Sequence, residues 1–403
     1  MQEFLFGAAL SAHQAEGGNI HNQWYEFEQK VLSKHNIKSG KSTNHYELYE
    51  EDFELARQLG HNAHRLSIEW ARIEPEEGKI DFQEIQHYRK VLKSLKEKNI
   101  KPVITLFHFS LPLWFCKKGG FLHKKNISRF IEYSKFIVGE LKDDLEYIIT
   151  INEPQVYAYQ GYLLGKWPPQ KRKYFAYVKI VKNLVKAHKW AYSELKAINP
   201  NFKISIAKNN QIFVPARKNH PIDNAITNYF DYTWNYHFLN KIHKQLDFIG
   251  LNYYFYRGVK FTPTLARKFY QFHYPTCRKT DMDWEVFPKG IYILLNELQK
   301  RYRLPIMITE NGVADDTDKL RQDVITETLE WVFKAKKEEV NIIGYLHWSL
   351  LDNMEWNEGF KYRFGLVKVD YNNYTRSIRP SALLYKQLID KYTEQMAKTA
   401  KKK

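Results

Sequence analysis

Two glutamates, each at the end of a short apolar run, are the residues of this sequence best suited to chemistry as a pair. Glu153 follows "LEYIITIN", and Glu310 follows "LPIMIT". Two carboxyl groups facing one another across a pocket can cleave a glycosidic bond, because one donates a proton to the leaving oxygen while the other acts on the far side of the anomeric carbon. A separation of about 5–5.5 Å allows direct attack with retention of configuration, and about 6.5–9.5 Å admits a water and gives inversion.

This chemistry requires the two carboxyl groups to differ in pKa, and two further residues could create the difference. Arg65, if it reaches Glu310, would hold that carboxylate ionised. Tyr254 could donate a hydrogen bond to the same group, and Asn152, next to Glu153, could bind a ring hydroxyl. Each of these residues alone is as easily explained by a structural role, so the interpretation depends on their occurring together.

Eight short β-rich runs predict the elements that would position these residues. Most of them are almost continuously apolar, as expected for strands that are covered on both faces. The runs are 4–9, 62–68, 101–107, 145–151, 203–207, 248–254, 304–310 and 342–348. Amphipathic helical patterns lie between most of them or follow the last, at 45–60, 82–99, 126–141, 174–198, 286–302, 319–339 and 380–396.

This alternation predicts an α/β fold, a single (β/α)8 TIM barrel over residues 1–396, followed by a basic C-terminal tail at 397–403. We expect the segments near 211–222 and 255–283 to be irregular loops over the site. An open doubly wound sheet is the competing architecture, but it usually shows a glycine-rich phosphate turn after the first strand. Here that strand runs into "SAHQAEGG", which does not fit.

Polar side chains follow nearly every predicted strand. In a barrel of this kind the site lies at the C-terminal ends of the strands, so we expect these side chains to converge there. The residues at or near the strand ends are His13, Gln14, Glu16, Arg65, His108, Asn152, Glu153, Asn209, Asn210, Asn252, Tyr254, Glu310, Asn311, Trp348, Asp352, Glu355 and Trp356.

Composition narrows the possible partners. Aromatic residues make up 16% of the chain, which suits either the binding of sugar-ring faces or an aromatic core. The net charge of +17 is compatible with a polyanion partner, but Lys alternates with Glu in the helical patterns and no nucleic-acid motif is found, so we expect no nucleic acid. Neither a signal peptide nor a membrane-spanning run is evident, and the two Cys suggest neither a disulfide framework nor a metal site. We expect a cytoplasmic protein that needs no metal or cofactor.

The motifs resemble those of glycoside hydrolase family 1, the β-glucosidase and β-galactosidase group, along nearly the whole chain. "TINEP" resembles the acid/base segment, which implies Glu153 as general acid and base. "ITENG" resembles the nucleophile segment, which implies Glu310. "HRLSIEWARIEP" and "IGLNYY" are similar to the segments that supply an Arg and a Tyr beside the nucleophile, here Arg65 and Tyr254.

The resemblance also implies a set of residues that bind the sugar and a small β-glycoside or oligosaccharide as substrate. The set is Gln14, His108, Asn152, Asn252, Trp348, Glu355 and Trp356. Trp348 would lie under the sugar ring, and Glu355 would accept hydrogen bonds from hydroxyls at its far edge. Family members that act on 6-phosphosugars usually carry Ser at the position of Glu355, followed by a Lys and a Tyr. The acid at 355 favours a neutral sugar, although Lys361 and Tyr362 leave the phosphorylated substrate open.

The sequence also departs from the family pattern. "HFS" places Phe109 and Ser110 where Trp or Phe and then Asp are usual, and "LLGKWPPQ" replaces an Ala-Pro-Gly stretch. The chain is shorter than usual around 211–247 and 255–283, which predicts a wider or barer aglycone entrance. Three hypotheses follow: a retaining exo-β-glycosidase, a sugar-binding barrel without activity, and a polyanion binder. The presence of both glutamates favours the first.

Overall fold

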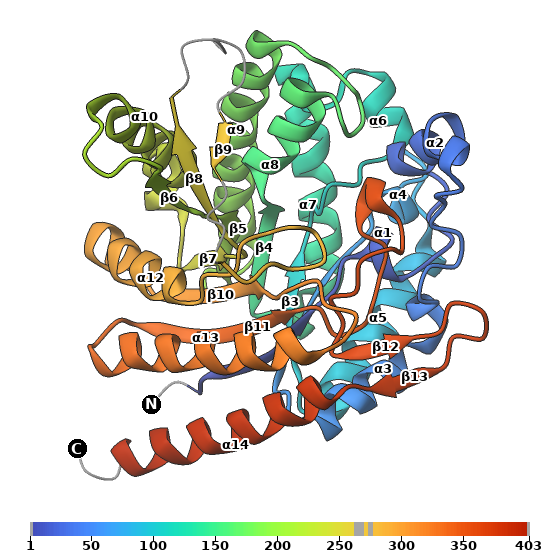
Figure 1. Ribbon diagram of the computed structural model, residues 1–403. Coiled ribbons are helices and arrows are strands. Elements are labelled where there is room, and N and C mark those ends of the chain that lie inside the picture. Colours follow the sequence, from blue (N-terminus) through green and yellow to red (C-terminus); the bar gives the residue numbers. More distant parts are fainter. Residues whose placement is uncertain (1–2, 262–269, 273–276, 401–403) are drawn as a thin grey trace.

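The computed structural model describes residues 3–261, 270–272 and 277–400 of the chain and has a closed barrel of eight parallel strands at its centre (Figure 1). Each strand coincides with one of the eight predicted runs, so the (β/α)8 fold is confirmed. The barrel strands are β1 (Leu5–Ala9), β2 (Ala63–Ser67), β3 (Lys101–Thr105), β4 (Tyr147–Asn152), β5 (Lys203–Asn209), β7 (Ile249–Asn252), β10 (Ile306–Asn311) and β11 (Ile342–Trp348).

The apolar runs are explained by burial on both faces of the strands. Successive side chains of a strand point to opposite faces. In β4, Tyr147 and Ile149 belong to the apolar cluster that fills the barrel, whereas Ile148 and Ile151 belong to the larger core outside it. A strand of this kind has no face for polar residues until it ends, so polar side chains gather at its C-terminal end.

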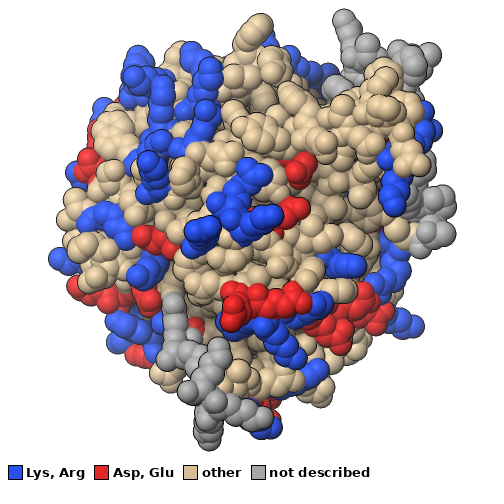
Figure 2. All heavy atoms as spheres, turned by 90° about the vertical axis from the view of Figure 1, so that its left-hand side faces the viewer, with Lys and Arg blue, Asp and Glu red and all other residues tan. Residues whose placement is uncertain are grey.

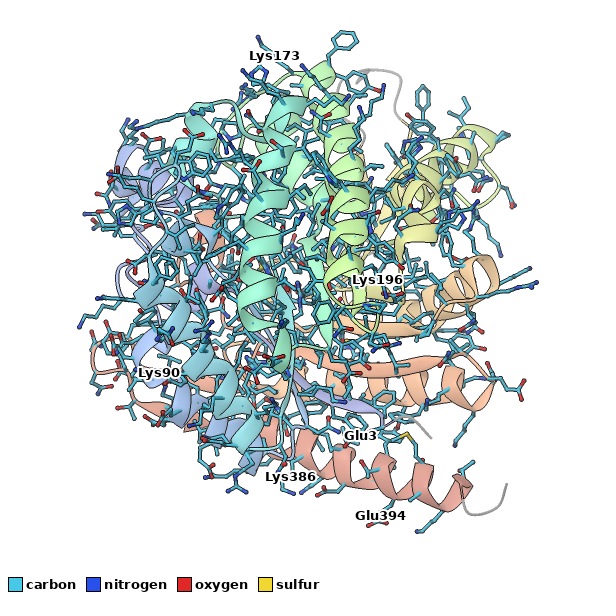
Figure 3. All side chains as sticks on the ribbon, turned by 180° about the vertical axis from the view of Figure 1, so that it is seen from behind. Glu3, Lys90, Lys173, Lys196, Lys386 and Glu394 are labelled. Atoms are coloured by element: carbon cyan, nitrogen blue, oxygen red, sulfur yellow. The ribbon has the colours of Figure 1, made fainter. Side chains whose placement is uncertain are left out.

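Long helices surround the barrel at the predicted places. They are α3 (His45–Gln58), α5 (Phe82–Glu97), α7 (Ile127–Leu141), α9 (Tyr174–Ile198), α12 (Lys289–Tyr302), α13 (Lys319–Lys337) and α14 (Pro380–Ala400). Seen from behind, α7 and α9 run side by side, with Lys173 and Lys196 marking the two ends of α9 (Figure 3). The tail expected from residue 397 begins inside α14, which continues to Ala400, and 401–403 lie outside the described residues.

Short helices line the connections at the barrel ends. They are α1 (Ala12–Ala15), α2 (Gln23–Lys30), α4 (Trp70–Ile73), α6 (Leu113–Lys117), α8 (Pro154–Ala158), α10 (Pro221–Asp231) and α11 (His237–Ile242). A π-helical turn, Tyr232–Tyr236, joins α10 to α11. The helices between β5 and β7 were not predicted.

The expectation of irregular loops at 211–222 and 255–283 is wrong for much of these segments. Strands β6 (Ile212–Pro215), β8 (Tyr256–Lys260) and β9 (Tyr270–Phe272) form a separate three-stranded sheet, in which β6 pairs with β8 in parallel. Each strand is too short to show a period, and its partner lies far away in the sequence, so no local pattern predicts it. Residues 262–269 and 273–276 fall outside the described part of the chain.

The positive charge is distributed over the surface among acidic residues. On the face shown in Figure 2, Lys and Arg occur in several groups, with Asp and Glu between them in its lower half. Exposed pairs such as Lys30–Glu26 at 2.7 Å and Lys386–Asp390 at 2.9 Å follow helical spacing. Within the described ranges, no helix has the length and apolar character needed to cross a bilayer.

Candidate active site

Glu310 lies buried in β10 and is held by two side chains from other strands. Arg65 of β2 forms an ion pair with Oε1, and the hydroxyl of Tyr254, two residues beyond β7, donates to Oε2 at 2.6 Å. Both contacts are those that the sequence led us to expect. The strand end is closely packed as well, because a Cβ at Gly312 would lie 1.9 Å from the carbonyl oxygen of Trp348.

Glu153 stands at the junction of β4 and α8 in a left-handed backbone conformation, with φ of 41°. Its Oε1 accepts hydrogen bonds from Nδ2 of Asn252 at 2.9 Å and Nδ2 of Asn209 at 3.1 Å. Thr309 donates to Oδ1 of Asn252 at 2.7 Å, so the amide of Asn252 is oriented with its nitrogen toward Glu153. The other oxygen, Oε2, has no hydrogen-bond partner among the described residues.

Asn152 connects the two glutamates through its side-chain amide. Its Oδ1 accepts from Nη2 of Arg65 at 2.8 Å and from Nδ2 of Asn252 at 3.2 Å. Its Nδ2 lies 3.0 Å from Nε2 of His108, which therefore accepts if Asn152 donates. Burial and the nearby Arg65 lower the pKa of His108 well below its ordinary value, so the imidazole is neutral.

The two carboxyl groups are raised in pKa by the same burial but differ in their neighbours. Burial, and then the charge of Glu310, raise the pKa of Glu153 to about 7. Burial also raises the pKa of Glu310, but there Arg65 and Tyr254 act in the opposite direction. Because Arg65 lies against Glu310, the first negative charge of the pair resides on Glu310. The pocket can therefore hold a carboxylate beside a carboxylic acid.

Aromatic rings form another wall of the site. Trp348 ends β11, and its ring centroid lies 5.8 Å from that of His108. Trp356 lies 6.2 Å from His108 and stacks on His13 at 6.0 Å. The predicted ring platform, Trp348, is thus beside the amide and imidazole groups that could bind hydroxyls.

Glu355 and Gln14 complete the set expected from the sequence. Burial, together with the charges of Glu310 and Glu153, raises the pKa of Glu355 to about 8. Gln14 donates to the carbonyl oxygen of Met354 at 2.7 Å, directly before Glu355. Contacts or charge therefore link all of the residues in the expected set to one pocket, and their roles stay predictions.

Several other polar residues at strand ends do not join this pocket. They are held elsewhere: His13 by Glu28 at 2.9 Å, Glu16 by Arg72 at 2.8 Å, Asp352 by Arg379 at 2.7 Å, and Asn311 by the carbonyl of Tyr253 at 2.6 Å. These contacts are structural. A polar strand end is thus a necessary signal for a site residue but not a sufficient one.

Sequence reasoning missed some groups that contact the site. Asn209 ends β5, and the sequence predicts no role for it beyond its place at a strand end, although it donates to Glu153. Thr105 and Thr309 hold Arg65 and Asn252, at 2.9 Å and 2.7 Å. Position at a strand end could have pointed to Asn209, but nothing in the local sequence distinguishes the two threonines from core residues. Across the described ranges, no group of three or more His, Cys, Asp or Glu residues could hold a metal ion.

The chain is similar to known proteins along nearly its whole length. It matches the model of glycosyl hydrolase family 1 over residues 1–242 and 235–394. Beta-glucosidase A of Thermotoga maritima is 32% identical, with 96% of each chain covered. The structure of a beta-glycosidase from Pyrococcus horikoshii is 40% identical and has a TM-score of 0.90, with 96% of this chain and 93% of that chain covered.

A further relative widens the range of substrates among similar proteins. A 6-phospho-beta-galactosidase of Clostridium acetobutylicum is 27% identical, and the match covers 96% of each chain. Fold, sequence match and paired carboxyl groups agree. The chain belongs to glycosyl hydrolase family 1.

Proposed function

We propose that this glycoside hydrolase is a retaining exo-β-glycosidase that removes terminal non-reducing β-D-glucosyl residues, and β-galactosyl and β-fucosyl residues as well. The observation that carries the proposal is the contrast between the two glutamates. Glu310 contacts a guanidinium and a phenol, whereas Glu153 contacts neutral amides and has a pKa of about 7. A nucleophile needs the first environment and a general acid needs the second.

In the first step the carboxylate of Glu310 attacks the anomeric carbon. The bond from that carbon to the leaving oxygen breaks, and Glu153 transfers its proton to this oxygen. Two amides already bind Oε1 of Glu153, so Oε2 is the oxygen that holds the proton. The product of the step is a glycosyl ester on Glu310 and a free alcohol.

In the second step a water molecule replaces the ester. Glu310 carries no charge while it is esterified, so the electrostatic cause that raised the pKa of Glu153 is absent. The pKa of Glu153 is therefore lower in this state, and its carboxylate takes a proton from the water as the water attacks the anomeric carbon. Two inversions leave the sugar with its original configuration.

The remaining residues of the set bind and orient the sugar. Arg65 and Tyr254 hold the nucleophile in place. Trp348 supports the ring, and the groups that bind hydroxyls are Gln14, His108, Asn152, Asn252, Glu355 and Trp356. No metal or organic cofactor takes part in the proposed steps, since the protons and the nucleophile all come from the two carboxyl groups and water.

Charge favours a neutral sugar over a 6-phosphosugar. After burial, the charge of Glu310 raises the pKa of Glu153, and the charges of both raise that of Glu355, so a phosphate beside Glu355 would add negative charge to an acidic pocket. A 6-phospho-β-glycosidase is nevertheless the second candidate, because Lys361 lies close by in the sequence, with its ammonium 5.0 Å from the ring centroid of Tyr362. A barrel that binds sugar without turnover is the third.

The test is hydrolysis of a panel of aryl β-glycosides, with Glu310→Gln as the matched control. The panel contains the β-glucoside, β-galactoside, β-fucoside and 6-phospho-β-glucoside. We expect release from the neutral glycosides that is lost in the variant. Release from the phosphorylated glycoside alone would establish the second candidate, and binding of glucose by calorimetry without release from any substrate would establish the third.

The proposal extends to the aglycone entrance and to the cellular location. We infer a wider aglycone entrance from the shortened segments, and part of these lies outside the described residues. A cytoplasmic role in carbohydrate metabolism agrees with free thiols at Cys116 and Cys277, because disulfides are rare in a reducing compartment.

A further inference from the structure

A chain of side-chain amides leads from a partly buried cation, Arg257, to the proposed acid. Nε of Arg257 in β8 donates to Oε1 of Gln211 at 2.6 Å. Nε2 of Gln211 donates to Oδ1 of Asn209 at 3.0 Å, and Nδ2 of Asn209 donates to Oε1 of Glu153 at 3.1 Å. The sequence motifs predict no catalytic role for Arg257, Gln211 or Asn209.

The direction of the chain is determined at both amides. A guanidinium has donors only, so Gln211 must turn its oxygen toward Arg257 and its nitrogen toward Asn209. The indole of Trp234, which can only donate, lies 3.2 Å from the same oxygen of Asn209. A flip of either amide would lose these bonds, and the end that reaches Glu153 is therefore a donor.

The backbone holds the middle of the chain in place. Asn235 accepts from the amide nitrogen of Gln211 at 3.0 Å and donates to its carbonyl oxygen at 2.7 Å. Strands β6 and β8 pair with Phe213 opposite Arg257, which places the guanidinium beside Gln211. The three-stranded sheet thus carries Arg257 to the rim of the barrel.

The charge of Arg257 is directed into this chain. Among the residues that the structure describes, no carboxylate forms an ion pair with it, and its other contact is the ring of Phe255, 5.0 Å from the guanidinium carbon. A cation at one end polarises successive hydrogen bonds in the same sense and strengthens the last donor. That donor binds Oε1 of Glu153, together with Asn252, and leaves Oε2 for the proton.

We propose that Arg257 is a positioning residue for Glu153, and that it acts through Gln211 and Asn209 to fix which carboxyl oxygen of Glu153 gives up the proton. The proposal rests on the proposed function of Glu153 as general acid. Hydrogen bonds to a carboxylate favour its charged form, so the chain also opposes the rise that burial causes in the pKa of Glu153.

Other ionisable groups face Glu153 and must be separated from the effect of the chain. The charge of Glu310 raises the pKa of Glu153, and Glu355 and Tyr254 lie within electrostatic reach of it. Lys208 of β5 is a buried cation that interacts with Glu153 by charge, and burial lowers the pKa of its amine to about 7, where Glu153 itself titrates. Its ammonium donates to the backbone carbonyl of Asn209, so it acts beside the chain rather than within it.

Three substitutions break or mimic the chain, and a fourth is the matched control. Arg257→Met removes the cation, and Arg257→Lys retains the charge. Gln211→Glu keeps the size and the contact with Arg257 but replaces the donor to Asn209 with an acceptor. Arg217→Met removes a guanidinium that lies two residues after β6 and binds Asp223 at 2.8 Å without touching the chain.

Each variant is assayed for kcat/KM against pH on an alkyl β-glucoside and a dinitrophenyl β-glucoside. For Arg257→Met and Gln211→Glu we expect a loss of about tenfold on the alkyl substrate, which needs protonation, and about twofold or less on the activated one. The alkaline limb of the profile reports the loss of the protonated form of Glu153 above its pKa. Loss of the chain raises this pKa, so the limb moves to higher pH, by about half a pH unit. Arg257→Lys should recover part of both effects, and Arg217→Met should show neither.

The outcomes distinguish failure of this proposal from failure of the proposed role of Glu153 as general acid. Equal losses on both substrates with an unmoved limb would overturn it, because a merely structural role gives that result. A limb shift that disappears in a Lys208→Met background would also overturn it, since the chain would then act on the lysine. If Glu153→Ala lowers kcat/KM equally on both substrates, Glu153 is not the general acid, and the proposed role of Arg257 is wrong as well.

Discussion

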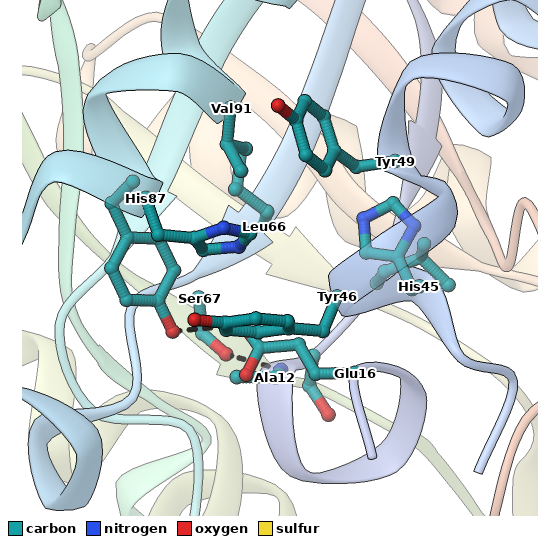
Figure 4. Close-up of a pocket in the computed structure, with 12 residues that line it drawn as sticks. Ala12, Glu16, His45, Tyr46, Tyr49, Leu66, Ser67, His87 and Val91 are labelled. Carbon is teal, nitrogen blue, oxygen red and sulfur yellow. Dashed lines mark hydrogen bonds between the residues drawn. The ribbon is translucent and has the colours of Figure 1, made fainter. Parts of the chain in front are cut away.

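Two clusters of buried ionisable groups in this molecule behave differently. One is the barrel mouth, with Glu153, Glu310 and Glu355. The other lies outside the barrel between α1, α3 and α5, where Glu16 lines a small cavity (Figure 4) and pairs with Arg72. We refer to the second as the outer cluster.

The outer cluster is closed and paired. Glu16 accepts from Nε of Arg72 at 2.8 Å and from the hydroxyl of Tyr88 at 2.8 Å, and Arg72 also lies 3.5 Å from Glu84. The ring of Tyr46 stacks on His87 at 3.7 Å. The cavity beside them measures about 10 Å³, which is barely room for one water. Nothing larger fits into this cavity.

The barrel mouth has an excess of acid. Of its three carboxyl groups, only that of Glu310 forms an ion pair among the described residues, with Arg65, and burial raises the pKa values of Glu153 and Glu355 to about 7 and 8. Burial alone is common to both clusters, so it does not identify a catalytic site. The difference is the unpaired acid, which keeps a transferable proton near neutral pH.

The largest effect should come from Glu310→Gln. The variant keeps the shape of the pocket but lacks the nucleophile, so kcat/KM on an aryl β-glucoside should fall by several orders of magnitude. Glu16→Gln in the outer cluster is the control and should keep the activity of each folded molecule. Near-wild-type kcat in Glu310→Gln would contradict the assignment.

Glu153→Ala should have the next largest effect, and it should depend on the substrate. General acid catalysis contributes about 10²–10⁴-fold, so an alkyl β-glucoside should lose activity in that range. An activated aryl glycoside needs little protonation and should lose far less in kcat/KM. Parallel measurements on the two substrates check this, and equal losses would remove Glu153 from the role of acid.

Arg72→Met should show the opposite behaviour. It leaves Glu16 buried without its cation, which should lower the free energy of unfolding by about 3 kcal/mol. Urea titration measures the loss, and kcat of the folded fraction should stay unchanged. Loss of activity without loss of stability would mean that the outer cluster has a catalytic share.

The smallest effect should be a gain in stability from Glu153→Gln. The native pKa of this group is raised, so its cost to folding is absent below the ordinary pKa of a glutamate and grows as the pH rises toward 7. The variant should be more stable than the wild type by about 2 kcal/mol at pH 8 and equally stable near pH 4. Thermal unfolding at the two pH values would contradict this if the difference were the same at both.

The barrel and its paired glutamates could be predicted because local sequence determines them. A strand buried on both faces is apolar along its length, so the polar residue that ends it stands out, as Glu153 does after β4. Parallel strands of a barrel end at the same rim, which brings Glu153 and Glu310 together without further information.

The sheet of β6, β8 and β9 could not be predicted, because local sequence does not determine it. Its register pairs Phe213 with Arg257, and nothing within either short strand specifies that partner. Helix α10 begins at Pro221 and contains Asn224 and Thr227, which are weak helix formers. Arg257 therefore looks like one more surface cation until the fold places it beside Gln211.

The most direct test of the central claim is to trap the covalent intermediate. A 2-deoxy-2-fluoro-β-glucosyl fluoride reacts with a retaining nucleophile and leaves an ester that hydrolyses slowly. Mass spectrometry of the digested protein should then find one glycosyl group, on Glu310. A glycosyl group on another residue, or hydrolysis with inverted product and no adduct, would contradict the account.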